Sequence, residues 1–315
     1  MKFIYGKQDW STFERGEETC CLMTNGLGGF SSLTATGSCS RNEHGVFTAC
    51  DHSPNHRVQM IQRLGEVLIQ GERTYVLSSQ DFEDHSRRED GWRFLSGFTF
   101  RDYPQWTWLA GGVEVVKALA LAPGENTVAV TYEVWNRSRE AATLQVAPHL
   151  RFVPKGEEMA PGQRFTLEGT HISSAGRSLY FHTNGRVEPL EQTLCGPFYY
   201  AHDVMDGKTA AGWAAVNHRL ALTAAPGGHE TLEAVYGLDP ALPAAAEVFA
   251  RVERERRALE AQAGFHDETA QALALAAHQF ISYRASTGKQ TILAGFPFFE
   301  DWGRDTMIAL GGCCL

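Results

Sequence analysis

The sequence lacks any long apolar run. No stretch reaches the roughly 18 consecutive apolar residues that a membrane-spanning helix needs, so we expect no membrane association. The first ten residues, from Met1 to Trp10, contain no sustained apolar core, and we therefore expect no secretory signal peptide.

An excess of basic residues is also missing. The chain has 28 Lys and Arg against 37 Asp and Glu, which gives a net charge of −9. Proteins that bind nucleic acid usually present a basic patch, so this balance argues against a nucleic-acid partner. With 315 residues, of which 43% are hydrophobic and 21% charged, the sequence suits a globular protein with one large domain and a smaller part.

Cysteines with metal-binding spacing are absent as well. The seven cysteines include two adjacent pairs, Cys20-Cys21 and Cys313-Cys314, but no Cys-x-x-Cys pattern. The spacing makes a zinc site improbable, and free thiols in a reducing compartment are the default interpretation. We therefore expect a cytoplasmic protein.

Other patterns typical of cofactor or metal sites are incomplete. Gly26-Leu27-Gly28-Gly29 lacks the third glycine of a dinucleotide fingerprint and predicts a tight turn. His44 and His56 have no matching metal ligands nearby in the sequence, so we expect surface or hydrogen-bonded histidines. The acidic cluster Asp81–His85 lacks the spacing of a calcium loop and favours a solvated loop. We expect no cofactor and no metal.

Short β-strands dominate the sequence up to about residue 240. Residues 113–121, 127–135 and 142–152 read as strands with turn residues between them, and 178–182 and 220–223 continue the pattern. The aromatic residues between Trp92 and Trp108 are expected mostly in the core of such a domain. These features predict a mainly β protein built on a large antiparallel β-sandwich, or supersandwich.

Helical character begins after Pro240. Residues 243–261 are rich in Ala, Glu and Arg, and their alternating charges indicate a solvated helix face. Asp267 is a candidate N-cap for a second helix, which we expect to run from Glu268 to Arg284 because Leu273, Ala276, Ala277 and Phe280 follow helical spacing.

The segment near the carboxyl end carries the residues best suited to sugar chemistry. Asp301-Trp302-Gly303-Arg304-Asp305 follows an aromatic run. Arg offers a planar set of donors, Asp accepts hydrogen bonds, and Trp supplies a flat apolar face, which together match the rim and faces of a pyranose ring. A buried Arg–Asp pair at the start of a helix is the alternative interpretation.

A resemblance to a known family rests on two motifs. Residues 294–310, Ala-Gly-Phe-Pro-Phe-Phe-Glu-Asp-Trp-Gly-Arg-Asp-Thr-Met-Ile-Ala-Leu, resemble the signature that opens the catalytic domain of bacterial glycogen debranching enzymes, the amylo-alpha-1,6-glucosidases. Residues 24–30, Thr-Asn-Gly-Leu-Gly-Gly-Phe, resemble the amino-terminal motif of that family. Residues 41–45 depart from its usual Arg-x-Tyr-His-Gly at Glu43. The two motifs bracket nearly the whole chain.

The resemblance implies a domain order. We expect a β-sandwich domain over residues 1–240, a helical linker over 241–266 and the start of an (α/α)6 glycosidase barrel over 267–315. The implied activity is hydrolysis of α-1,6-glucosidic branch points in glycogen or limit dextrin, and the negative charge of the chain would not repel an uncharged α-glucan.

The resemblance also implies residue roles. Arg304 and Asp305 would hydrogen-bond the terminal glucose, Trp302 would shape the pocket wall, and Asp301 would contribute to binding or cap the next helix. The two catalytic carboxyl groups that such hydrolysis requires lie downstream in the family, so we expect no catalytic residue within this sequence.

Members of the family continue from Ile-Ala-Leu with Pro-Gly and a long helix, whereas Gly311 to Leu315 follows here. We therefore expect a truncated chain that is inactive alone and self-associates through the exposed face of helix 268–284. Two alternatives remain open at this point. One is a non-catalytic glucan-binding module, and the other is a related glucosidase that acts on trehalose or other oligosaccharides.

Overall fold

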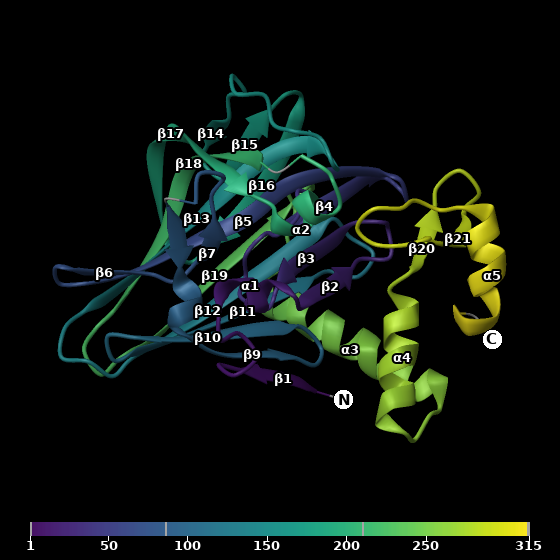
Figure 1. Cartoon of the computed structure of the whole chain (residues 1–315), viewed down its shortest axis with the longest axis horizontal. Coiled ribbons are helices and arrows are strands. Elements are labelled where there is room, and N and C mark those ends of the chain that lie inside the picture. Colours follow the sequence, from purple (N-terminus) through teal and green to yellow (C-terminus); the bar gives the residue numbers. More distant parts are fainter. Residues whose placement is uncertain (1, 86, 210, 314–315) are drawn as a thin grey trace.

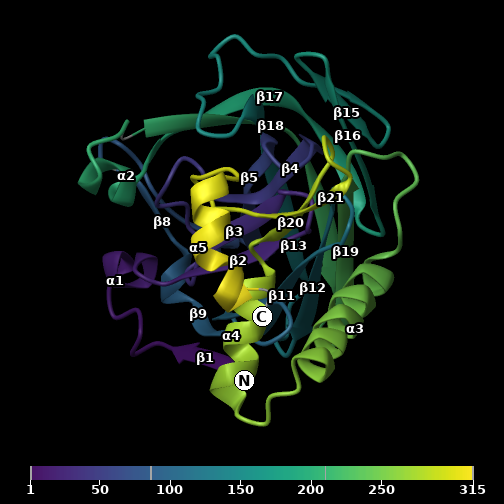
Figure 2. The same cartoon turned by 90° about the vertical axis from the view of Figure 1, so that its right-hand side faces the viewer.

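The computed structural model describes residues 2–85, 87–209 and 211–313. Most of the chain forms two large sheets that pack face to face (Figure 1). The carboxy-terminal segment, from residue 267 onward, lies at one end of this sandwich (Figures 1 and 2). The expected β-sandwich is thus confirmed.

Nine strands form the first sheet, and each hydrogen-bonded pair in it is antiparallel. Their order across the sheet is β1 (Phe3–Gly6), β9 (Leu95–Phe100), β10 (Pro104–Ala110), β11 (Val113–Leu121), β12 (Thr127–Asn136), β19 (His229–Gly237), β16 (Arg177–Thr183), β15 (His171–Ser174) and β14 (Thr166–Glu168).

Eight strands form the second sheet, which is also antiparallel. Their order is β17 (Arg186–Tyr199), β18 (Ala211–Ala224), β13 (Ala142–Pro154), β5 (His56–Gln70), β4 (Gly45–His52), β3 (Phe30–Thr34) and β2 (Cys20–Thr24), with β6 (Arg73–Val76) paired to β5. Two small two-stranded sheets join β7 (Ser79–Asp81) to β8 (Arg88–Asp90) and β20 (Ile281–Arg284) to β21 (Lys289–Ile292).

The core lies between the inner faces of the two large sheets. Strand β12 shows how the sequence produces it: Tyr132 and Val134 are buried, whereas Glu133 and Trp135 between and after them point outward, as the period of two dictates. Trp106 and Trp108 of β10 are fully buried in the same core. Phe98 is buried with them, and the other four aromatic residues from 92 to 108 are partly buried against this core, which confirms the expectation that these residues belong mostly to the core.

An ion pair links the two large sheets through this core. Lys117 of β11 donates through Nζ to Glu66 Oε1 of β5 at 2.6 Å, and Tyr132 donates to the same oxygen at 3.0 Å. Both Lys117 and Glu66 are only 4% exposed. A buried ion pair is tolerated when its partners are close and further hydrogen-bonded, as here.

Helices are short in the sandwich and longer after it. The first part of the chain contains α1 (Phe13–Glu17), the 3-10 turn η1 (Gly91–Arg93) and α2 (Ala201–Met205); the later part contains α3 (Ala245–Ala263), α4 (Glu268–His278) and α5 (Gly303–Cys313). Helix α3 packs through Val248 and Val252 on β11, β12 and β19, and ends at Gly264 in the left-handed conformation.

The expected helix from Glu268 to Arg284 is wrong beyond His278. Asp267 caps α4 as expected, accepting from the Ala270 amide at 2.9 Å, but the helix ends at His278 and residues 281–284 form strand β20. The Tyr283 amide donates to the Gly26 carbonyl oxygen at 2.7 Å. The Tyr283 amide thus makes a hydrogen bond to the amino-terminal turn in place of the intrahelical hydrogen bond that helical spacing predicts.

No helix in the described residues is long and apolar enough to cross a membrane.

Candidate functional site

The two motifs that bracket the sequence lie against each other. Thr24 donates through Oγ1 to the carbonyl oxygen of Gln279 at 3.0 Å, and the rings of Phe30 and Phe296 meet edge to face with centroids 5.6 Å apart. Gly28 has φ +96°, and a Cβ there would lie 2.1 Å from the carbonyl oxygen of Pro54. The glycines therefore let the amino-terminal turn approach the β4–β5 connection closely, as the predicted tight turn requires.

Arg57 fastens the aromatic run to the sandwich. Its guanidinium lies 4.8 Å from the ring centroid of Phe296 and donates to the carbonyl oxygen of Pro297 at 3.2 Å. Arg57 is 2% exposed, and this burial lowers the pKa of its guanidinium. A desolvated cation over an aromatic face is worth about 2 kcal/mol.

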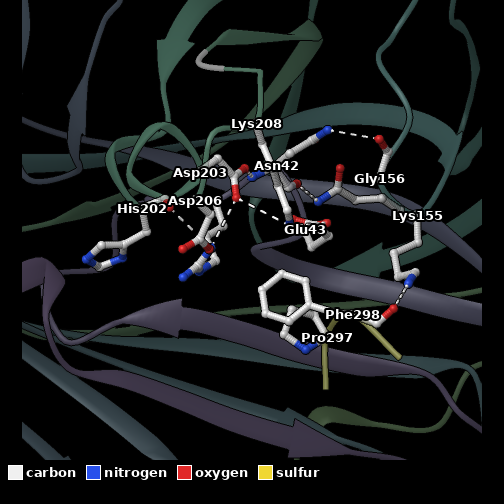
Figure 3. A network of polar contacts seen from close by, with 12 residues as sticks. Asn42, Glu43, Lys155, Gly156, His202, Asp203, Asp206, Lys208, Pro297 and Phe298 are labelled. Carbon is white, nitrogen blue, oxygen red and sulfur yellow. Dashed lines mark hydrogen bonds and ion pairs between the residues drawn. The ribbon is translucent and has the colours of Figure 1, made fainter. Parts of the chain in front are cut away.

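Phe298 is surrounded by three cationic side chains of the sandwich domain (Figure 3). The Lys208 ammonium lies 4.2 Å from its ring centroid and the Arg41 guanidinium 5.1 Å away. Lys155 donates through Nζ to the Phe298 carbonyl oxygen at 2.6 Å. Phe298 therefore anchors the segment before Trp302 to the sandwich.

Carboxylates hold these cations in place (Figure 3). Arg41 pairs with Asp203 at 3.3 Å and with Asp206 at 2.5 Å, while Lys208 lies 3.5 Å from Glu43. Burial raises the pKa of Asp203, the more enclosed of the two aspartates. Glu43, where the resembled motif more often has Tyr, thus has a defined partner next to the Phe298 anchor.

Asp301 is fully engaged inside the protein. It accepts from Asn55 Nδ2 at 2.6 Å, from Thr291 Oγ1 at 3.2 Å and from the guanidinium of Arg284. Its side chain is 3% exposed, and its amide donates back to Asn55 Oδ1 at 3.3 Å. These contacts join Asp301 to the β4–β5 connection through Asn55, to β20 through Arg284 and to β21 through Thr291.

Three of the four residues that follow Asp301 carry side chains that face outward. Trp302 is 58% exposed, the Arg304 side chain 84% and the Asp305 side chain 36%, and the Arg304 Nε lies 3.8 Å from Asp305 Oδ2. The alternative interpretation of a buried Arg–Asp pair is therefore wrong, because the pair lies on the open face of α5. An exposed ring beside an exposed guanidinium and carboxylate presents the groups that a sugar contacts.

Sequence reasoning missed the residues that hold this loop. Asn55 and Arg57 contact it from 240 or more residues away and Arg284 from 17 residues away, and no local spacing marks any of them. Residues 41–45 follow the amino-terminal motif closely in the sequence, so Arg41 could be assigned to a motif. Nothing in the sequence indicated that Arg41 contacts Phe298.

The weaker candidates behave mostly as expected. His44 is buried and its Nδ1 accepts from the Ser40 amide at 3.3 Å, while burial lowers its pKa to about 3. His56 pairs with Asp51 at the surface. Asp81 departs from the expected solvated loop, because it is only 5% exposed and accepts from Arg88 at 3.1 Å.

Within the described residues, no group of three or more His, Cys, Asp and Glu side chains is arranged to hold a metal ion. The described cysteines Cys20, Cys21, Cys39, Cys50, Cys195 and Cys313 are free thiols. Cys314 and Leu315, part of the tail from which truncation was expected, lie outside the described residues.

Comparison with known proteins gives two family matches. The family described as "Glycogen debranching enzyme N terminal" matches residues 20–231, and the family described as "Amylo-alpha-1,6-glucosidase" matches residues 275–315. No curated protein matches the chain.

Two solved structures are similar over most of the chain. One is a "Putative kojibiose phosphorylase from human microbiome", with 8% identity, a TM-score of 0.38 and coverage of 86% of this chain and 36% of that one. The other is a bacterial glucoamylase complexed with acarbose, with 9% identity, a TM-score of 0.37 and coverage of 88% and 42%. This chain thus spans less than half the length of either protein.

Proposed function

Because the chain belongs to the glycogen debranching enzyme family, whose amino-terminal model covers residues 20–231, we propose that it serves the hydrolysis of α-1,6-glucosidic branch points in glycogen or limit dextrin. Its own contribution is recognition of a terminal glucose by Trp302, Arg304 and Asp305. Asp301 fixes the position of that loop through its buried hydrogen bonds and does not itself contact the sugar.

The observation that carries this proposal is the contrast within residues 301–305. The Asp301 carboxylate has three donors, whereas the side chains of Arg304 and Asp305 are exposed and 3.8 Å apart. A charged group that hydrogen-bonds a neutral hydroxyl contributes about 1.5–3 kcal/mol. Two such groups beside a Trp face suffice for a weak saccharide site.

Catalysis is not part of the proposed contribution of this polypeptide. Cleavage of a glucosidic bond by inversion needs two carboxyl groups about 6.5–9.5 Å apart, one to protonate the leaving oxygen and one to activate water. Asp301 is saturated with donors, and Asp305 is assigned to the sugar hydroxyls. We therefore expect the 315-residue chain to release no glucose from a limit dextrin.

For the domains, we propose a sandwich over residues 1–240, a linker over 241–266 and the beginning of a helical glycosidase domain over 267–315. The last strand of the sandwich ends at Gly237 and α3 begins at Ala245, which supports the first boundary.

A non-catalytic glucan-binding module is the second candidate function. The observation that favours it is that the Asp301 carboxylate already accepts three hydrogen bonds and is not available as an acid or base. A binding module needs exposed binding groups but no acid–base pair. Both functions predict that this chain binds glycogen. They differ in whether that binding serves the hydrolysis of a glucosidic bond.

Affinity electrophoresis in a glycogen-containing gel tests the proposal. Arg304→Ala should abolish most of the retardation, and Arg73→Ala is the matched control because it removes an arginine, 58% exposed, from β6 on the opposite side of the sandwich. Retardation that survives Arg304→Ala would locate glycogen binding on the sandwich instead. Glucose release from limit dextrin by the pure chain would contradict the expected lack of catalysis.

A further inference from the structure

A cavity lies between the tips of two hairpins. Residues 52–56, where β4 turns into β5, form one side of it, and Arg284 and Ser286 of the β20–β21 hairpin form the other. The Ala285 amide donates to the Ser53 carbonyl oxygen at 3.1 Å, which holds the two tips together. The cavity measures about 310 Å³, and none of residues 302–305 lines it. This volume is at the lower end of the range of about 300–1,000 Å³ that is typical of small-molecule sites.

Basic side chains line this cavity and acidic ones do not. His52, His56 and Arg284 belong to its wall, and the other lining residues are uncharged: Ser53, Pro54, Asn55 and Ser286. His52 and His56 lie opposite each other in the antiparallel β4–β5 pair, so their side chains project from the same face. A wall of this kind contrasts with the net charge of −9 of the whole chain. A cation in the cavity would meet basic groups and no lining carboxylate.

The carboxylates that pair with these basic groups lie outside the cavity wall. Asp51 contacts Nδ1 of His56, and Asp301 accepts from Nη1 of Arg284. Neither Asp51 nor Asp301 lines the cavity. Each pair therefore has its basic member at the cavity. Because Coulomb energy falls with distance, a ligand in the cavity interacts more strongly with the basic groups than with the carboxylates.

The hydrogen-bonding capacity that remains in the wall is mainly that of donors. Asn55 has both polar atoms of its side-chain amide engaged with Asp301. Arg284 donates through Nε to Ser286 Oγ at 3.0 Å, which leaves its Nη2 without a partner among the described residues and the Ser286 hydroxyl proton free to donate. The side chain of His52 makes no hydrogen bond or ion pair with the described residues. These free donors match a ligand that carries several acceptor oxygens.

We propose that this cavity binds a phosphate group, with Arg284 and Ser286 donating from one hairpin and the rings of His52 and His56 from the other. A guanidinium matches the geometry of phosphate oxygens. A tetrahedral phosphate presents oxygens in several directions and so reaches donors on both hairpins, which a planar carboxylate does less well. Free phosphate and a phosphate monoester share this chemistry. The site is independent of the glucose recognition proposed for residues 302–305.

The test is calorimetric titration of the full chain with inorganic phosphate and with methyl phosphate at constant ionic strength. A pH of about 6 suits it, because a protonated histidine ring donates from both nitrogens. Arg284→Gln should raise the dissociation constant at least about tenfold, since it removes a charge-assisted donor.

Arg257→Gln is the matched control for this titration. Arg257 on α3 is 70% exposed and pairs with Glu253 away from the cavity. Because an exposed ion pair of this kind contributes little to stability, Arg257→Gln should change the dissociation constant by less than about twofold.

A second variant separates loss of the ligand contact from a folding defect. Arg284→Gln also removes a partner of the buried Asp301, whereas His52→Ala removes a side chain that has no partner in the described residues. His52→Ala should therefore leave the melting temperature of the free chain unchanged. It should still raise the dissociation constant for phosphate at least about threefold.

The melting temperature gives an independent readout, because an occupant joins the β4–β5 connection of the sandwich to β20. Phosphate should raise it in the wild-type chain and much less in either variant. Tighter binding of methyl phosphate than of inorganic phosphate would identify a monoester as the ligand, and the reverse order would identify free phosphate. Absence of saturable binding up to about 20 mM phosphate, equal affinity in the wild type and His52→Ala, or acetate binding as tight as phosphate would each overturn the proposal.

Discussion

The sandwich buries its large apolar side chains, whereas the carboxy-terminal segment exposes many of its own. Trp106 in β10 is fully buried between two sheets, whereas Trp302 is 58% exposed. Helix α5 has no buried residue, although its sequence includes Met307, Ile308 and Leu310. The sandwich closes its own core, and the segment is attached at a few points, chiefly Phe296, Phe298 and Asp301. The apolar side chains of α5 therefore stay exposed.

The same substitution, tryptophan to alanine, should have very different effects on stability at Trp106 and at Trp302. Trp106→Ala should lower the free energy of unfolding by about 3–5 kcal/mol, because it empties a fully packed site. Trp302→Ala should change it by less than about 0.5 kcal/mol. Urea denaturation followed by circular dichroism measures both. Equal losses would mean that α5 is packed as tightly as the sandwich.

Acid should weaken the sandwich by about 3 kcal/mol between pH 6.5 and 5. Burial lowers the pKa of His44 and His149 to about 3 and that of His218 to about 4, from an ordinary 6.5. Below pH 6.5 the unfolded chain therefore binds more protons, and stability falls as pH falls. Burial raises the pKa of Glu17 to about 7, which acts in the opposite direction but offsets only one histidine.

Denaturation at several pH values measures this slope. His149→Gln should reduce the slope between pH 6.5 and 5 by about 1 kcal/mol per pH unit. A slope of opposite sign would mean that Glu17 and other carboxyl groups dominate.

Phe298→Ala should loosen the contact between the sandwich and the carboxy-terminal segment. Loss of its contacts with Arg41 and Lys208 should cost about 1–2 kcal/mol of local opening free energy over residues 294–301. Hydrogen exchange of these amides should quicken about tenfold while the sandwich strands stay protected. Phe299→Ala, at a neighbouring ring that is 57% exposed, is the control and should have little effect.

Exposed apolar side chains on α4 and α5 should cause weak self-association. Met307 and Ile308 are 73% and 77% exposed on α5, and Leu273 on α4 is 65% exposed. We expect these side chains to bring copies of the chain together, each contributing about 1 kcal/mol. Light scattering should show the double variant Met307→Ser/Ile308→Ser associating less than the wild type. A monodisperse wild-type monomer would contradict the expectation.

Much of the sandwich was predictable from local patterns. The strands expected at 113–121, 127–135 and 142–152 correspond to β11, β12 and β13, because alternation and turn residues mark a half-buried strand directly. The helix expected at 243–261 corresponds to α3. The helix from 268 to 284 was predicted too long, since helical spacing cannot reveal that the Tyr283 amide bonds to Gly26.

The candidate site also has a part that local sequence predicts and a part that it does not. Residue types and their order are enough to show that Trp302, Arg304 and Asp305 lie within four positions and suit a sugar. They do not show that Asp301 is buried against Asn55 and Arg284 while the Arg304 side chain is 84% exposed. Residue type fixes which groups are available, but the exposure of each group depends on contacts between distant segments, such as that of Asn55 with Asp301, which are 246 residues apart.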